Sequence, residues 1–236
     1  MQFEPALQQG RLQKRYKRFL ADVLTADGKP LTLHCPNTGS MKNCLVPDSP
    51  CWYWDSANPK RKLPHTLELV TTPSGHLACV NTARPNALVV EAIRNGTVTE
   101  LQDYQQLATE VRYGQENSRI DILLSGGQQS IYIEVKNTTL LEDDGIGYFP
   151  DAVSERASKH LRELISVVEA GHRGVIFFCV NHTGIERVRP ADHIDPSYGR
   201  LLREAAGAGV ELLAYRSVIS AQAIQLYTKL AVELPD

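Results

Sequence analysis

Short runs of alternating apolar and polar residues recur through the first third of the chain. They cover residues 18–24, 31–35, 51–55 and 67–71, and turn signals such as Asp27-Gly28 and Pro73-Ser74-Gly75 lie between them. Short strands at regular spacing, broken by glycine and proline, are typical of a small barrel or sandwich. The pattern therefore predicts a module of strands in residues 1–80.

The pattern changes to that of a helix near residue 81. Pro85 suits a first helical turn, Asn95-Gly96 supplies a stop, and between them runs an apolar stripe of Leu88, Val89, Ala92 and Ile93. A second helix is expected over residues 151–171, capped by Asp151 or Ser154, with a buried stripe of Val153, Ala157, Leu161, Leu164, Ile165 and Val168. A central strand over 174–180, a helix over 197–206 and a strand over 210–215 complete an α/β sandwich in residues 81–236.

Residues 119–137 have the pattern of a hairpin of two antiparallel strands around Gly126-Gly127. The period of two gives the second strand two faces. Ile131, Ile133 and Val135 lie on the apolar face, and Tyr132, Glu134 and Lys136 lie on the polar face. Glu134 and Lys136 then leave the backbone about 7 Å apart on one side. The partner strand can bring Asp121 beside them.

Two carboxylates and one lysine are the groups that metal-assisted phosphodiester cleavage requires. Carboxylates hold Mg²⁺ or Mn²⁺, the metal activates a water, and a lysine steadies the nucleophile or the developing charge. The order of Asp121, a spacer and Glu134-Val135-Lys136 resembles the core of the PD-(D/E)XK nucleases, which have the restriction-endonuclease-like fold. The alternative is a strand whose polar face is merely solvated.

Two further acids are candidates for additional metal ligands. Glu91 lies at the edge of the buried helical stripe, and Glu110 lies in a strand-like run before the hairpin. For each of them the alternative is an ordinary surface carboxylate.

Composition narrows the class of protein. With 236 residues, 42% hydrophobic and 22% charged, the chain has the composition of a globular protein with one or two domains. The first residues lack a basic flank followed by an apolar segment, and no apolar run is long enough to span a bilayer, so we expect a cytoplasmic protein without membrane partners. Five cysteines without a Cys-X-X-Cys pair argue against disulfides and structural zinc and predict free, mostly buried thiols.

Charge is distributed unevenly. Residues 1–62 hold ten Lys and Arg against five Asp and Glu, and the remainder holds fifteen against twenty-two. A basic module joined to an acidic one suits a protein that captures phosphates with the first and metal with the second.

Two groups of residues are candidates for nucleic-acid contacts. The first is a basic cluster interleaved with aromatic residues, comprising Arg11, Lys14, Arg15, Tyr16, Lys17, Arg18 and Phe19. Its alternative is a strand with an exposed basic face. The second is the pair Arg156 and His160, which lie four residues apart on one flank of the second helix. This flank either faces the cleft, where both side chains can contact phosphate, or simply forms the edge of the helix.

The segment 34–41, His-Cys-Pro-Asn-Thr-Gly-Ser-Met, has no hydrophobic period and is rich in hydrogen-bonding groups. It is either a phosphate or ligand contact or a well-capped loop, since asparagine, threonine and glycine are common in turns.

The chain resembles the sugar fermentation stimulation protein A (SfsA) family over essentially its whole length. The resemblance rests on five strings, which lie at residues 34–39, 85–91, 118–121, 134–137 and 149–152, and on Arg156 and His160-Leu161. It implies an N-terminal OB-like barrel, a C-terminal nuclease-like domain, non-specific DNA binding and a role in regulating maltose metabolism. By this pattern Glu91, Asp121, Glu134 and Lys136 match the nuclease core.

These observations predict a DNA-binding protein with a Mg²⁺-dependent phosphodiesterase centre. Asp121 and Glu134 would hold the metal, Glu91 would be a third or water-mediated ligand, and Lys136 would orient or activate the attacking water. The rival is a non-catalytic DNA-binding regulator that keeps the nuclease fold as a scaffold. A sugar-metabolising enzyme has little support, because no nucleotide-binding loop is present. The oligomeric state does not follow from the sequence.

Overall fold

The computed structural model describes residues 1–114 and 118–235, apart from the side chain of Asp143. In this part of the chain, the first domain is a six-stranded sheet in the order β3-β2-β1-β4-β5-β6. Its strands are β1 (Gln8–Tyr16), β2 (Leu20–Thr25), β3 (Pro30–His34), β4 (Pro50–Asp55), β5 (His65–Thr71) and β6 (Leu77–Cys79). A pairing of β3 with β5 at His34 and Thr66 closes the sheet into a barrel, so the predicted module of short strands is confirmed.

The second domain contains a nine-stranded mixed sheet in the described part of the chain, ordered β10-β11-β13-β15-β14-β12-β9-β8-β7. Its strands are β7 (Gln106–Tyr113), β8 (Ser118–Ser125), β9 (Ile131–Thr138), β10 (Leu140–Asp143), β11 (Ile146–Phe149), β12 (Arg173–Val180), β13 (Arg187–Pro190), β14 (Glu211–Ile219) and β15 (Ile224–Val232). Its helical elements are α1 (Arg84–Arg94), η1 (Thr99–Leu101), α2 (Glu155–Glu169) and α3 (Pro196–Gly207).

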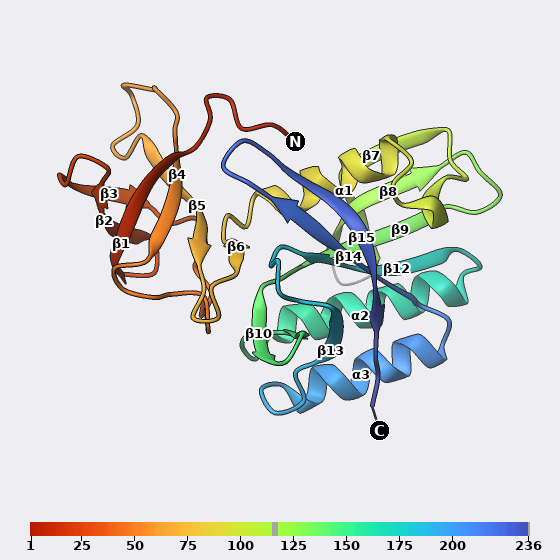
Figure 1. The fold of residues 1–236 in the computed structure, drawn as a ribbon. Helices are drawn as coiled ribbons and strands as arrows, with labels where there is room; N and C mark the ends of the chain where they lie inside the picture. Colours follow the sequence, from red (N-terminus) through yellow and green to blue (C-terminus); the bar gives the residue numbers. More distant parts are fainter. Residues whose placement is uncertain (115–117, 236) are drawn as a thin grey trace.

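Helices cover both faces of this sheet. The side chains of the central strand β12 alternate between two cores. Phe177 belongs to the core that contains Leu88 of α1, and Phe178 belongs to the core that contains Leu161 of α2. α2 and α3 contact each other and lie together on one side of the sheet, while α1 covers the other side (Figure 1). The predicted helix–sheet–helix layering is therefore confirmed, and so is the apolar central strand.

The second predicted helix differs from the structure at its start. α2 begins at Glu155, because the Ser154 hydroxyl accepts the N–H of Ala157 and caps the helix there. Val153 therefore precedes the helix and is 73% exposed, so its predicted place in the buried stripe is wrong. The five cysteines are free and buried, as predicted.

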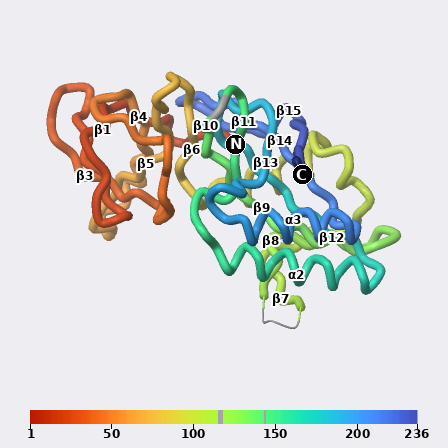
Figure 2. The backbone as a smooth tube through the Cα atoms, turned by 90° about the horizontal axis from the view of Figure 1, so that it is seen from below, coloured from red at the N-terminus to blue at the C-terminus, as the bar shows by residue number. Residues whose placement is uncertain are grey.

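The domains are joined at more than one place. The chain begins against the second domain, where Phe3 N–H donates to Gln222 and Leu7 N–H donates to Ala221. It then builds the barrel and returns through β6, whose Cys79 N–H donates to the carbonyl of Asn181. The tube view shows the barrel beside the sheet domain, with the junction between them (Figure 2). The junction is therefore bonded through backbone as well as through side chains.

Candidate active site

The hairpin of β8 and β9 opens where the candidate acid lies. The two strands are paired from Leu124, opposite Ile131, to Ile122, opposite Ile133. The pairing ends there. At the next position the carboxylate of Asp121 takes the place of a backbone partner, and its Oδ2 accepts the N–H of Val135 at 2.8 Å. This arrangement holds the Asp121 carboxylate between the two strands.

Glu134 and Lys136 project from the same face of β9 and are almost completely buried, at 3% and 7% exposure. The Lys136 ammonium donates to Glu134 Oε1 at 2.8 Å. His160, from α2, places Nδ1 against the same oxygen and lies 3.5 Å from Lys136 Nζ. The face is therefore not a solvated strand surface, and its charges are compensated by pairing inside the protein.

The environment of each acid shifts its pKa. Burial raises the pKa of Asp121, and the neighbouring negative charge of Glu134 raises it further. Burial alone would also raise the pKa of Glu134, but Lys136 and His160 outweigh it and lower the pKa of this carboxyl. The two acids therefore repel each other, while two basic side chains stabilise the ionised form of one of them.

One carboxylate oxygen of the site is left without a partner. Glu134 Oε2 is buried and has no hydrogen-bond partner within the described residues. A buried acceptor of this kind is costly unless something donates to it or binds it. No group of three or more His, Cys, Asp or Glu side chains in the described ranges is placed to share a metal ion. Mg²⁺ commonly takes only one or two carboxylates and completes its shell with water and substrate phosphate, so Asp121 and Glu134 fit it.

Glu91 and Glu110, the other candidate ligands, lie on neighbouring elements. Glu91 on α1 is paired with the N-terminal amine of Met1 at 2.6 Å, and its side chain is 42% exposed. Glu110 is exposed, has a positive φ of 56° and interrupts the ladder of β7 and β8 opposite Asp121. Among the described residues, neither is hydrogen-bonded to Asp121 or Glu134, but both line one cavity together with Asn86, which donates to Asp121. The role of Glu91 as a metal ligand stays a prediction.

A basic hollow adjoins the site. It has a volume of about 400 Å³ and is lined by Glu110, Arg112, Ser118, Arg119, Arg156, Lys159 and His160, and we call it the cationic cavity. Arg119 and Arg156 are exposed. Arg156 and His160 both line this cavity, and the described partners of His160 are Glu134 and Lys136. Their contact with phosphate stays a prediction.

The basic cluster of the barrel is partly occupied by internal contacts. Arg11 is paired with Asp48, and Asp22 pairs with Lys14 at 3.4 Å and accepts from the Tyr16 hydroxyl at 3.1 Å. Arg15 donates to the carbonyls of Asn37 and Gly39 at 2.8 and 2.9 Å. Lys17 and Arg18 lie exposed in the turn after β1, both with positive φ. Of the cluster, these last two residues are the ones placed best for an external phosphate.

Two contacts that position the acids were not predicted: Asn86 was not named as a site residue, and His160 was predicted only as a nucleic-acid contact. Asn86 donates to Asp121 Oδ1 at 2.9 Å, and His160 contacts Glu134. Each is a polar residue at the spacing of a buried stripe, Asn86 before Val89 and Ile93, and His160 between Ala157 and Leu164. A polar residue within such a stripe is the signal that could have identified both.

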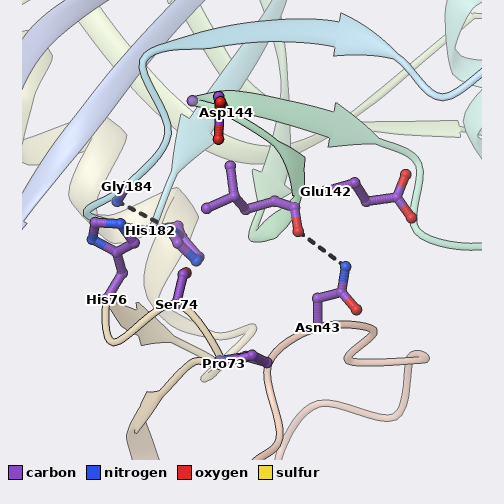
Figure 3. Close-up of a pocket in the computed structure, with 10 residues that line it drawn as sticks. Asn43, Pro73, Ser74, His76, Glu142, Asp144, His182 and Gly184 are labelled. Carbon is purple, nitrogen blue, oxygen red and sulfur yellow. Dashed lines mark hydrogen bonds between the residues drawn. The ribbon is translucent and has the colours of Figure 1, made fainter.

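Another hollow, the histidine cavity, lies between the domains. It measures about 340 Å³ and is lined by Asn43, Pro73, Ser74, His76, Leu141, Glu142, Asp144, Gly145, His182 and Gly184 (Figure 3). The rings of His76 and His182 are 5.7 Å apart, and His182 Nδ1 accepts the N–H of Gly184 at 3.0 Å. Burial, and then the neighbouring His76, lower the pKa of His182 to about 4. The nuclease-like core does not use these groups.

In the described residues, no helix combines the length and apolar character needed to cross a membrane.

Comparisons with known proteins agree over both domains. A family model described as "Sugar fermentation stimulation protein RE domain" matches residues 83–223, and one described as "SfsA N-terminal OB domain" matches residues 14–80. A sugar fermentation stimulation protein homolog from Teredinibacter turnerae is 61% identical over 234 residues, covering 99% of this chain and 100% of the relative. One from Saccharophagus degradans is 58% identical, covering 91% and 92%.

A solved structure, that of Pyrococcus furiosus SfsA in complex with Ca²⁺, covers 99% of this chain and 98% of the other. Its TM-score is 0.86 at 25% identity. Together these matches confirm the predicted OB barrel and the restriction-endonuclease-like fold of the second domain.

Proposed function

The chain belongs to the sugar fermentation stimulation protein family, and we propose that it binds DNA with little sequence preference and hydrolyses phosphodiester bonds with Mg²⁺ or Mn²⁺. One observation carries the proposal. Glu134 and Lys136 are buried side by side next to Asp121, and Glu134 Oε2 has no partner in the described residues. Burying these charges is expensive, and they form the donor set that metal-assisted phosphoryl transfer uses.

Asp121 and Glu134 would hold the metal, with Glu91 as a third or water-mediated ligand. A bound divalent ion would supply an activated water and neutralise charge on the phosphoryl group. The Lys136 ammonium orients the attacking water and stabilises negative charge where it develops. His160 and Asn86 hold Glu134 and Asp121 in place through the contacts described above.

The cationic cavity supplies a path for the DNA backbone. Arg119 and Arg156 are exposed at its wall, and His160 connects it to the Glu134 carboxylate. Guanidinium groups form forked hydrogen bonds to phosphate and carry no information about base sequence. Contacts of this kind support binding that depends on salt and not on sequence.

The relative from Pyrococcus furiosus supports a divalent ion, because its structure is that of a complex with Ca²⁺. Ca²⁺ and Mg²⁺ are both hard cations that take oxygen ligands. The family name concerns sugar fermentation, and we propose that any effect on maltose metabolism passes through DNA binding.

A cleavage assay tests the proposal. Plasmid and single-stranded DNA are incubated with the purified protein, with and without Mg²⁺ or Mn²⁺. The wild type should nick or degrade DNA only with metal, and Asp121→Asn and Glu134→Gln should each lose the activity. Asp48→Asn, which removes an acid from the barrel surface, is the matched control and should retain it. Activity that persists in Asp121→Asn would assign the cleavage to a contaminant.

The rival function is that of a non-catalytic DNA-binding regulator. It is favoured by one feature, the double neutralisation of Glu134 Oε1 by Lys136 and His160. A wild type that binds DNA but neither cleaves it nor gains thermal stability from metal would establish this alternative.

A further inference from the structure

A hollow of about 220 Å³ crosses the junction of the two domains beside Lys136, and we call it the junction cavity. Its lining consists of Asn37, Thr38, Gly39, Thr82, Asn137, Thr139, Leu140, Tyr148, Phe149 and Asp151. Asn137 directly follows Lys136, and the Lys136 ammonium lies 6.0 Å from the centre of the Phe149 ring. The junction cavity therefore adjoins the candidate catalytic lysine, and the segment 34–41 forms its wall on the barrel side.

Two polar side chains of the lining, one from each domain, have groups that face the cavity. Asn37 is 7% exposed and Thr139 is 9% exposed. Asn37 Oδ1 accepts the N–H of Gly39 at 2.8 Å, whereas the Asn37 Nδ2 group and the Thr139 hydroxyl have no protein partner among the described residues. Neither atom is closed off from solvent. Both groups are therefore available to pair with a ligand in the cavity.

The wall is held firmly on both sides. Arg15 donates to the carbonyls of Asn37 and Gly39, and the Thr82 hydroxyl donates to the carbonyl of Pro36 at 3.1 Å. Ser40 donates to the carboxylate of Asp151 across the junction at 2.7 Å. The open groups are therefore preorganised, which lowers the entropic cost of binding.

The chemistry of the junction cavity favours a nucleobase over a phosphate. Of the described residues that line it, none is lysine or arginine, and Asp151 is an acid. Neutral amides and hydroxyls pair with base edges, and the rings of Phe149 and Tyr148 offer flat apolar surface. A volume of about 220 Å³ is below that of a typical drug-sized pocket and suits a single base.

We propose that the junction cavity receives one unpaired base of the DNA strand whose backbone passes Lys136. This inference rests on the proposed DNA binding. A paired base is stacked inside the duplex and cannot enter such a cavity unless it is flipped out. The preferred substrate is then single-stranded DNA, or a duplex with frayed or unpaired positions. The barrel contributes to substrate choice through segment 34–41 and not only through charge.

Fluorescence anisotropy in EDTA tests this inference without cleavage. Three DNA ligands of equal length are compared: a single strand, the same strand with an abasic sugar at every position, and a blunt duplex. Wild type should bind the normal single strand about tenfold more tightly than the abasic strand. Equal affinity for these two would overturn the inference, and this comparison needs no variant.

Two variants and a matched control locate the effect. Thr139→Val removes the open hydroxyl at nearly constant shape, and Asn37→Ser removes Nδ2 while keeping a short acceptor for the Gly39 N–H. Each should lose about tenfold in affinity for the normal single strand and stay within about twofold for the abasic strand and the duplex. Thr71→Val changes a barrel threonine outside the junction cavity whose hydroxyl is bonded to the carbonyl of Pro50, and it should change none of the three affinities by more than about twofold.

A loss in Thr71→Val equal to that in Thr139→Val would overturn the inference, because it would assign the effect to a general change in the barrel and not to the cavity. Unchanged binding in both Thr139→Val and Asn37→Ser would overturn it as well. A wild type that distinguishes the normal from the abasic strand but cleaves nothing with Mg²⁺ would defeat the nuclease proposal alone. Absence of binding to all three ligands would instead defeat the proposed DNA binding on which this inference rests.

Discussion

The carboxylate of Asp121 accepts the backbone N–H of Val135 at 2.8 Å, in the place where the ladder of β8 and β9 would otherwise continue. Its other oxygen accepts from Asn86 at 2.9 Å. A charged side chain thus performs a structural task while being held next to Glu134, whose charge opposes its ionisation. Asp121 therefore has two roles, as an acceptor for the backbone and as a negative charge next to Glu134. A substitution that keeps the acceptor but removes the charge can separate these roles.

Asp121→Asn should leave the protein at least as stable as wild type near pH 7.5. Folding raises the pKa of Asp121, so this carboxyl favours the fold when protonated, below its unfolded pKa, and that contribution is lost as the pH rises through the folded pKa. The amide never ionises, and it can still accept the Val135 N–H and pair with Asn86 after an amide flip. The advantage of the variant should shrink as the pH falls toward about 4. Urea unfolding at several pH values measures this, and a variant that is less stable at pH 7.5 would contradict the pKa direction.

Metal should stabilise wild type, because an ion that binds the folded state alone shifts the unfolding equilibrium. A thermal-shift titration with Mg²⁺ or Mn²⁺ should show a rising Tm, and Asp121→Asn should abolish the response. Asp48→Asn should respond as wild type does. An equal response in all three proteins would place the metal outside the candidate site.

Lys136→Met should reduce any nuclease activity by about a hundredfold or more, since it removes a group that stabilises transition-state charge. It should also lower the free energy of unfolding by roughly 3 kcal/mol, because Glu134 keeps a buried charge with one partner fewer. The matched change Lys14→Met breaks an exposed pair with Asp22 and should cost less than about 1 kcal/mol. Similar losses of stability in the two variants would show that burial does not strengthen the Lys136 pair.

Lys17 and Arg18 should account for part of the salt dependence of DNA binding. The double change Lys17→Asn and Arg18→Asn removes both charges, and asparagine tolerates the positive φ of this turn. The slope of log affinity against log salt should flatten by about 2, near 0.9 for each lost phosphate contact. The control Arg11→Gln with Lys14→Gln removes two cations already paired with acids and should flatten it by less than about 1. Equal changes would assign binding to net charge alone.

His182 should make the protein sensitive to acid. Its pKa is lowered to about 4, so its contribution to stability is present above pH 6.5 and is lost as the pH falls through the folded pKa. Between pH 7.5 and 4.5 the loss should be about 2 kcal/mol. In His182→Asn, whose Oδ1 can replace Nδ1 as acceptor for Gly184, this part of the pH dependence should disappear. An identical pH profile for both proteins would show that His182 does not titrate as described.

Sequence periodicity predicted the elements whose residues alternate or repeat over a sufficient length. The barrel strands β2 to β5, α1, α2, the hairpin and β12 were predicted in this way, and so were the positions of Asp121, Glu134 and Lys136. Strands such as β11 and β13 were missed, because four residues give too short a period to detect. The contacts of Asn86 and His160 were missed for another reason. They depend on how α1 and α2 lie across the sheet, which local pattern does not encode.

The first seven residues have a further consequence. The N-terminal segment packs on the sheet domain before the chain builds the barrel and returns. The barrel is therefore held by one covalent connection, after β6, and by a second, non-covalent one through residues 1–7. A protease that cuts the chain either just before or just after the barrel would therefore not separate the two domains. The backbone bonds of Phe3 and Cys79 would keep the nicked halves together, and separation would require two cuts or denaturation.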